Sequence, residues 1–176
     1  MGLAVPIPRT FTVGETETGA YFNALRDAVN FLLNPPDFKG RQATLQTTVT
    51  ATWTPMNLDL TVIDTYGGHS NVTNNTRYTA QVPGTYLVWG DPAWTNAGAA
   101  CRFESAIAKN GTIDIGSPQF LVKPTTDFGA LLAVAQIPMV VGDYVEIWGR
   151  QNSGANLNTA PNVDLCPTFN ALWIHA

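Results

Sequence analysis

Charged residues are scarce in this chain. Only 12% of its 176 residues are Asp, Glu, Lys or Arg, about half of the usual share, and the net charge is −4. Recognition of nucleic-acid phosphates requires a basic face, so the composition excludes nucleic acid as a partner. Much of the surface must consist of Thr, Asn, Ser and Gln, which suits packing against copies of the chain or a larger assembly.

Long apolar runs are also missing. The most apolar stretch, residues 128–141, is interrupted by Gln136 and Pro138 and is shorter than the roughly 20 residues that a membrane-spanning helix needs. The first residues lack the basic start, apolar centre and cleavage site of a signal peptide. We therefore expect no membrane partner and synthesis in a cytoplasm.

The chain has two cysteines, Cys101 and Cys166, which are too few for a disulfide scaffold. Each stands in an apolar, strand-like context, which favours buried free thiols. A bridge between the two is the alternative that the sequence leaves open.

Residue patterns typical of catalysis are absent. The two histidines, His69 and His175, lack the spacing to further ligands that a zinc site shows. There is no nucleophile-elbow motif and no glycine-rich phosphate loop. Most Asp residues read as turn or strand-end residues, with calcium binding by loop Asp and Asn as the weaker alternative. We predict no catalytic residues, metal or cofactor, and hence no enzyme.

The stretch from Arg77 to Trp89 indicates strands. Tyr78, Ala80 and Val82 alternate with polar residues, the period of a strand with one buried face. A Pro-Gly pair follows at 83–84 and marks a tight turn. Residues 86–89 are apolar on both faces, as in a strand buried inside a sandwich.

Similar segments recur along the chain. Asn110-Gly111 is a strong hairpin signal, and no second helical pattern appears. The further strands that we predict cover residues 43–53, 58–63, 99–109, 129–138, 144–151 and 168–175. About eight strands separated by turns predict a mainly β fold, an antiparallel sandwich of jelly-roll type.

One convincing helix spans residues 15–34. Phe22, Leu25, Val29 and Leu32 are spaced three, four and three apart and form one apolar stripe. The pair Pro35-Pro36 ends the helix. The stripe packs either on its own domain or in a short bundle with symmetry-related copies. Two heptads are too few for a free coiled coil, so in a bundle the β domain would do most of the assembling.

The segments that flank this helix contain proline. Pro6 and Pro8 favour an extended arm at residues 1–14, and residues 35–41 resemble a linker. We therefore predict an N-terminal unit of arm and helix at residues 1–41 and a head domain at residues 42–176.

The tryptophans fall in predicted strands or at their ends, so core or subunit-interface packing is the default interpretation. Tyr66 and Trp94 lie nearest to loops. A carbohydrate platform built on one of these two is the alternative.

Parts of residues 43–176 resemble the globular heads of the first complement component and the tumour necrosis factors. The resemblance lies in Asp-Thr-Tyr-Gly-Gly at 64–68, in the strand-corner-strand pattern at 77–88, and in Val-Gly-Asp-Tyr-Val-Glu-Ile at 141–147. It extends to the closing apolar strand at 169–174. The family implies a jelly roll that forms homotrimers, although its collagen stalk is missing here.

The N-terminal part is similar to small virion proteins of tailed bacteriophages, especially those of actinobacteria. The likeness rests on Arg-Thr-Phe at 9–11, Gly-Glu at 14–15 and Asn-Ala-Leu-Arg-Asp at 23–27. Such proteins are minor tail or head-decoration proteins. The resemblance implies a role in attachment or assembly for this segment, on a virion that is assembled in the host cytoplasm.

Together these observations predict a non-enzymatic phage virion structural protein, and we favour a trimeric capsid decoration protein. Its partners would be its own copies and phage capsid or tail proteins. The alternative is a minor tail or fibre protein, or a module that binds a glycan of the host surface through loops 66–75 and 152–162. The predicted anchoring or assembly residues are Ile7, Phe11, Phe22, Leu25, Val29 and Leu32. The predicted trimer interface comprises Tyr86, Trp89, Phe169 and Trp173, for which core packing is an equal explanation. The predicted ligand-loop residues are Tyr66 and Trp94.

Overall fold

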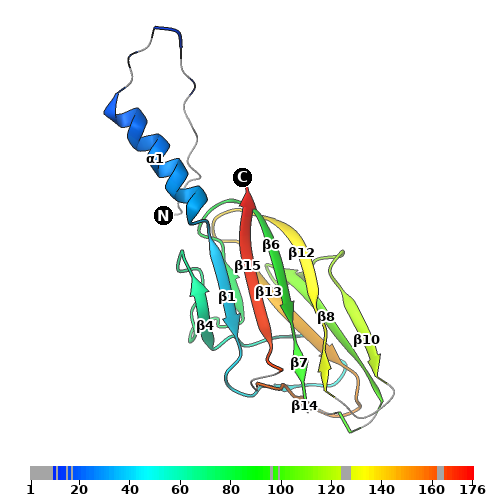
Figure 1. Ribbon diagram of the computed structural model, residues 1–176. Helices are drawn as coiled ribbons and strands as arrows, with labels where there is room; N and C mark the ends of the chain where they lie inside the picture. Colours follow the sequence, from blue (N-terminus) through cyan, green and yellow to red (C-terminus); the bar gives the residue numbers. More distant parts are fainter. Residues whose placement is uncertain are drawn as a thin grey trace.

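The chain forms a β-sandwich from which a single helix, α1 (Gly19–Leu33), projects at one end (Figure 1). The computed structural model describes residues 10, 12–14, 16, 18–95, 97, 98, 100–123, 128–161 and 165–176. The C-terminus lies at the same end of the sandwich as the base of α1.

One face of the sandwich is a five-stranded antiparallel sheet. In spatial order its strands are β12 (Ala133–Met139), β6 (Gly84–Asp91), β15 (Thr168–His175), β1 (Asp37–Arg41) and β4 (Leu60–Asp64). The first and last long strands of the sandwich, β1 and β15, pair directly, with Asp37 opposite Leu172. A β-bulge in the pairing of β1 with β4 shifts the register between Lys39 and Gly40.

The other face is a six-stranded sheet. Its main order is β10 (Gln119–Lys123), β8 (Cys101–Lys109), β13 (Tyr144–Gln151) and β3 (Thr54–Pro55), with β5 (Arg77–Thr79) on β13 and β9 (Thr112–Ile113) on β8. Two short pairs, β11 (Gly129–Ala130) with β7 (Ala93–Trp94) and β14 (Leu157–Asn158) with β2 (Thr47–Thr48), lie at the end opposite α1.

The structure confirms the predicted antiparallel jelly-roll sandwich with one helix. Strands β13 and β15 have the predicted bounds, and β8 begins two residues later than expected. Asn110 and Gly111 form the hairpin between β8 and β9 with φ values of 51° and 77°. Positive φ at both central residues is what the Asn-Gly pair supplies in such a turn.

The predicted linker at residues 35–41 is wrong for residues 37–41, which form β1, an inner strand of the five-stranded sheet between β15 and β4. The head therefore starts after Pro35-Pro36, a few residues before the boundary expected at 41. The pattern Asp-Phe-Lys-Gly-Arg hides the strand because Phe38 is its only large apolar residue. A side chain at Gly40 would start 2.6 Å from the Phe38 ring, so this glycine makes room for the aromatic core. The strand expected at 43–53 is reduced to β2.

The main core between the sheets is aromatic. Phe38 is fully buried and stacks on Tyr78 with ring centroids 5.0 Å apart, and it meets the edge of Phe169 at 6.1 Å. The Tyr86 hydroxyl donates a hydrogen bond to the Val82 carbonyl. Burial raises the pKa of Tyr86 to about 12. Burying such a side chain stabilises the fold by roughly 1.5–3 kcal/mol.

A smaller cluster closes the end of the sandwich away from α1. Trp94 stacks on Phe103 at 5.0 Å, and Cys101 and Leu157 complete the cluster. Both cysteines are free thiols, Cys101 buried and Cys166 half-buried, and burial raises the pKa of each. The interpretation as free thiols is therefore confirmed.

Candidate functional site

Helix α1 presents an apolar stripe to solvent. The predicted stripe residues Phe22, Leu25, Val29 and Leu32 are 54%, 41%, 45% and 67% exposed. The buried residues of the helix are Ala28 and Phe31, which lie on a neighbouring face at 100° per residue. Ile7 and Phe11, the other predicted anchoring residues, lie outside the described residues.

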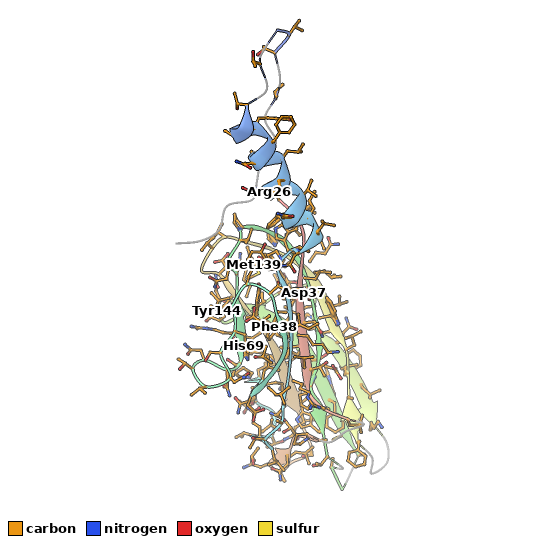
Figure 2. The ribbon with its side chains drawn as sticks, turned by 60° about the vertical axis from the view of Figure 1, so that its left-hand side comes forward. Arg26, Asp37, Phe38, His69, Met139 and Tyr144 are labelled. Carbon is orange, nitrogen blue, oxygen red and sulfur yellow. The ribbon has the colours of Figure 1, made fainter. Side chains whose placement is uncertain are left out.

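The base of α1 is fixed to the head. The Phe31 ring meets the edge of Trp173 at 4.9 Å and that of Tyr66 at 6.3 Å. The Tyr66 hydroxyl donates to the Asn34 carbonyl at 3.1 Å. Figure 2 shows the helix standing away from the sandwich with side chains on several sides. The helix direction is thus set by contacts at its last turn, and the stripe keeps a defined orientation.

The residues predicted for the trimer face divide between two environments. Tyr86 and Phe169 are fully buried and Trp173 is 8% exposed, and all three belong to the main core. They therefore serve core packing, which the sequence allowed as an equal explanation. Trp89 lies on the same strand as Tyr86 but points to the opposite face, because neighbouring strand residues alternate between the two faces of a sheet. Trp89 is therefore on the outer face of the five-stranded sheet.

The outer face of the five-stranded sheet carries further apolar side chains. Leu87 opposes Leu172, and Val134 opposes Trp89; all four are at least partly exposed. Beside them lies a hollow of about 600 Å³. Its lining residues are Lys39, Trp89, Asp91, Ala130, Leu131, Leu132, Thr168 and Asn170. This sheet face therefore combines exposed apolar side chains with a hollow of mixed polarity.

The two residues predicted for a ligand loop have structural roles. Trp94 is fully buried, and its indole N–H donates to the Thr48 hydroxyl at 3.1 Å. Its ring cannot stack on a ligand, because Phe103 and the surrounding cluster cover it. Tyr66 is half-buried against Phe31 and holds the base of α1. A carbohydrate platform on Trp94 is therefore ruled out in this fold.

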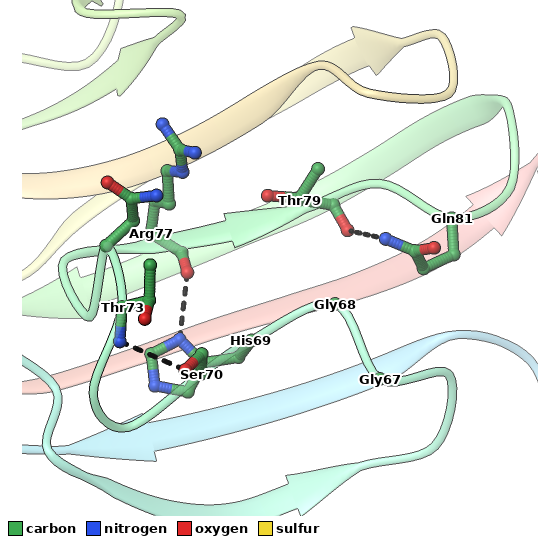
Figure 3. Close-up of a pocket in the computed structure, with 9 residues that line it drawn as sticks. Gly67, Gly68, His69, Ser70, Thr73, Arg77, Thr79 and Gln81 are labelled. Atoms are coloured by element: carbon green, nitrogen blue, oxygen red, sulfur yellow. Dashed lines mark hydrogen bonds between the residues drawn. The ribbon is translucent and has the colours of Figure 1, made fainter.

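The loop after β4 nevertheless forms one side of a polar groove (Figure 3). The groove has a volume of about 300 Å³ and runs along β5, the strand that lies at the edge of the six-stranded sheet. Its lining residues are Gly67, Gly68, His69, Ser70, Thr73, Asn74, Arg77, Thr79 and Gln81.

His69 is part of the scaffold of this groove. Its Nδ1 lies 2.8 Å from the Arg77 carbonyl and its Nε2 lies 2.8 Å from the Leu58 carbonyl. The ring also packs against Phe38 at 4.9 Å. Because both nitrogens face backbone carbonyl oxygens, neither is available as a general base or metal ligand. Within the described ranges, no three His, Cys, Asp or Glu residues are grouped as a metal site would require.

Comparison with solved structures finds the same fold in two animal proteins. The globular domain of zebrafish complement 1qA matches with 14% identity and a TM-score of 0.51, over 80% of this chain and 98% of that one. Murine APRIL matches with 9% identity and a TM-score of 0.56, over 78% of this chain and 98% of that one. No family model and no curated protein sequence matches. At these identities the likeness shows the fold alone, a jelly roll like that of these two proteins.

Sequence reasoning located the helix stripe but missed the groove. Loop 66–75 was named as a possible glycan-binding loop, but the only residue singled out in it was Tyr66, whereas the groove is lined by glycines and polar side chains. The useful signal was the pair of alternating polar residues Arg77 and Thr79 beside the buried Tyr78.

No helix among the described residues has the length and apolar character to cross a membrane.

Proposed function

We propose that the chain is a non-enzymatic, homotrimeric structural module on the exterior of a phage virion, in which the head projects outward. The observation that carries the assembly is the apolar stripe of α1, which stays exposed although the helix base is firmly docked. A helix with a water-exposed apolar stripe is stabilised by packing that stripe against a partner.

Two further copies of the chain suit this stripe. Its three-four-three spacing is that of facing helices in a bundle, and the docked Phe31 gives each copy the same helix direction. Leu87, Trp89, Val134 and Leu172 supply a second apolar contact on the outer face of the five-stranded sheet. This second contact is needed because helices of about two heptads are too short to form a stable bundle alone.

Attachment to the virion rests on the resemblance of the N-terminal residues to small phage virion proteins. The segment before α1 would contact capsid or tail proteins, and the trimer would display three heads. We favour capsid decoration over the tail, because one short head domain covers a shell better than it spans a fibre.

The decisive test of assembly is the light-scattering mass of the full chain beside two helix variants. Leu25→Asp adds a charge to the stripe, and Asn23→Asp adds the same charge on the polar side of the helix. We expect a trimer for the wild type and Asn23→Asp, and a large shift to monomer for Leu25→Asp. A monomeric wild type, or a trimer that tolerates Leu25→Asp, contradicts the assembly proposed here.

The virion role has its own test. In phage particles that carry each variant, Asn23→Asp should be incorporated normally, while Leu25→Asp should be lost from purified virions. Normal incorporation of Leu25→Asp contradicts a virion role that depends on trimer assembly through the helix stripe.

A further inference from the structure

Two arginines on the outer face of the six-stranded sheet have contrasting surroundings. The Arg102 guanidinium lies 4.5 Å from the Phe120 ring centre and pairs with Glu104 at 3.0 Å. The Arg77 guanidinium lies 4.4 Å from the Tyr144 ring centre. Its side chain has no hydrogen bond or ion pair with any described part of the chain. Arg77 is one of the residues that line the polar groove, and the five N–H donors of its guanidinium have no acceptor among the described residues.

The carboxylate nearest to Arg77 in the sheet register is already bound elsewhere. Glu146 is the Cα partner of Arg77 across β5 and β13 and is almost fully buried. One of its oxygens accepts from the Thr76 hydroxyl at 2.6 Å, and the other accepts from the Trp148 indole at 2.9 Å. The groove lining itself contains no Asp or Glu.

Other side chains of the groove are also unused. Among the described residues, the side chains of Thr73, Asn74 and Thr79 have no hydrogen-bond partner. The Ser70 hydroxyl accepts the backbone N–H groups of Val72 and Thr73 and keeps its own proton for donation. The groove therefore combines one unpaired cation with neutral hydroxyl and amide groups.

The backbone beneath these groups is held in place. Asp64 accepts the N–H groups of Gly68 and His69, at 3.0 and 2.9 Å. His69 ties the loop to Leu58 and Arg77, and the Thr79 N–H donates to the Gly68 carbonyl. A site whose backbone is preorganised while its side chains are unpaired loses little conformational entropy when a ligand binds.

We propose that this groove binds a carboxylate-bearing sugar of about one ring. A guanidinium offers two parallel N–H donors that match one carboxylate. The hydroxyl and amide groups suit the hydroxyls of a sugar, and the volume is at the lower end of the range for small-molecule sites, ~300–1,000 Å³. This site does not depend on the trimer proposed above, since the groove lies within one chain.

The test is calorimetric titration of the full chain with glucuronate, with glucose and acetate as probes of the neutral ring and the charge alone. We expect saturable binding of glucuronate and at least ten-fold weaker binding of glucose and of acetate. Arg77→Gln should weaken glucuronate binding by about ten-fold or more, because a hydrogen bond to a charged group is lost. The matched control Arg102→Gln removes an arginine that also lies over an aromatic ring but is outside the groove, and should bind as the wild type does.

A second variant keeps the test valid if Arg77→Gln fails to fold. Asn74→Asp places a negative charge in the groove at a position with φ of 51°, which Asp tolerates as Asn does, and should also weaken binding. Absence of glucuronate binding by the wild type overturns the proposal. Equal weakening by Arg77→Gln and Arg102→Gln, or equal affinity for glucose and glucuronate, overturns it as well. Because each of these outcomes is read on a chain of any oligomeric state, failure here leaves the trimer proposal intact.

Discussion

The head and the helix treat their apolar residues in opposite ways. In the head, aromatic rings such as Phe38, Tyr78 and Phe169 are enclosed between two sheets and contact one another. In α1, Phe22 and Leu32 are more than half exposed although the helix is apolar along one side. The core of the head is closed within one chain, although Val134 and Phe120 stay exposed on its outer faces, whereas the helix packs against the head only at its base.

This difference indicates where a partner belongs. A closed core gains nothing from association, but an exposed stripe held in a fixed direction does. The ion pairs follow the same division: Arg26–Asp27 on α1 is well exposed, while Lys109–Asp143 in the head is mostly covered. Stability should therefore respond to changes in the head, and assembly to changes on the stripe.

The largest effect is expected from Phe38→Ala in the centre of the head. Loss of a fully buried ring should lower the free energy of unfolding by about 3–5 kcal/mol, measured by urea denaturation. Val62→Ala on the exposed edge strand β4 is the control and should change it by less than about 0.5 kcal/mol. Similar losses for the two variants would contradict a closed core around Phe38.

An intermediate effect is expected at the junction between the two parts. Phe31→Ala removes the contacts with Trp173 and Tyr66, and should lower the free energy of unfolding by about 2 kcal/mol. It should also free the direction of α1, which is measurable as increased amide exchange of the helix while the sandwich keeps its protection. Unchanged exchange in α1 would show that other contacts hold it.

The smallest effect concerns charge and appears only in acid. Hydrogen bonds from Lys109 and Asn110 lower the pKa of Asp143 to about 2. Because the folded pKa lies below the unfolded value of about 3.9, the contribution of Asp143 to stability is present above pH 4 and is lost as the pH falls towards 2. Stability curves of wild type and Asp143→Asn should therefore differ above pH 4 and converge near pH 2. Asp27→Asn, in the exposed pair on α1, should match the wild type throughout, since such pairs contribute little; a difference that persists at pH 2 would contradict the assignment to Asp143.

Sequence patterns predicted the fold where they were periodic. The apolar stripe of α1, the hairpin at Asn110-Gly111 and the strands β13 and β15 all follow from spacing and turn chemistry. The sequence pattern did not predict strand β1, because Lys39, Gly40 and Arg41 show no apolar alternation. The pairing of β1 with β15 is decided by tertiary contacts. The sequence showed that Trp94 lies near a loop but not that it is buried, because its burial depends on contacts with Phe103 and with Thr48, which is distant in sequence. The alternation of Arg77 and Thr79 indicates only their outward face; that they line a groove could not be predicted, because it depends on where the loop after β4 packs.

The direct pairing of β1 with β15 has a consequence for biosynthesis. The centre of the five-stranded sheet joins the first strand of the head to its last, so this sheet cannot close until the ribosome has released β15. Pairing of segments so distant in sequence slows folding. During that interval α1 has already emerged with its apolar stripe and without the Trp173 contact that orients it. Newly made chains are thus most prone to premature association through the helix, and the yield of correctly folded protein should improve when synthesis is slowed or cooled.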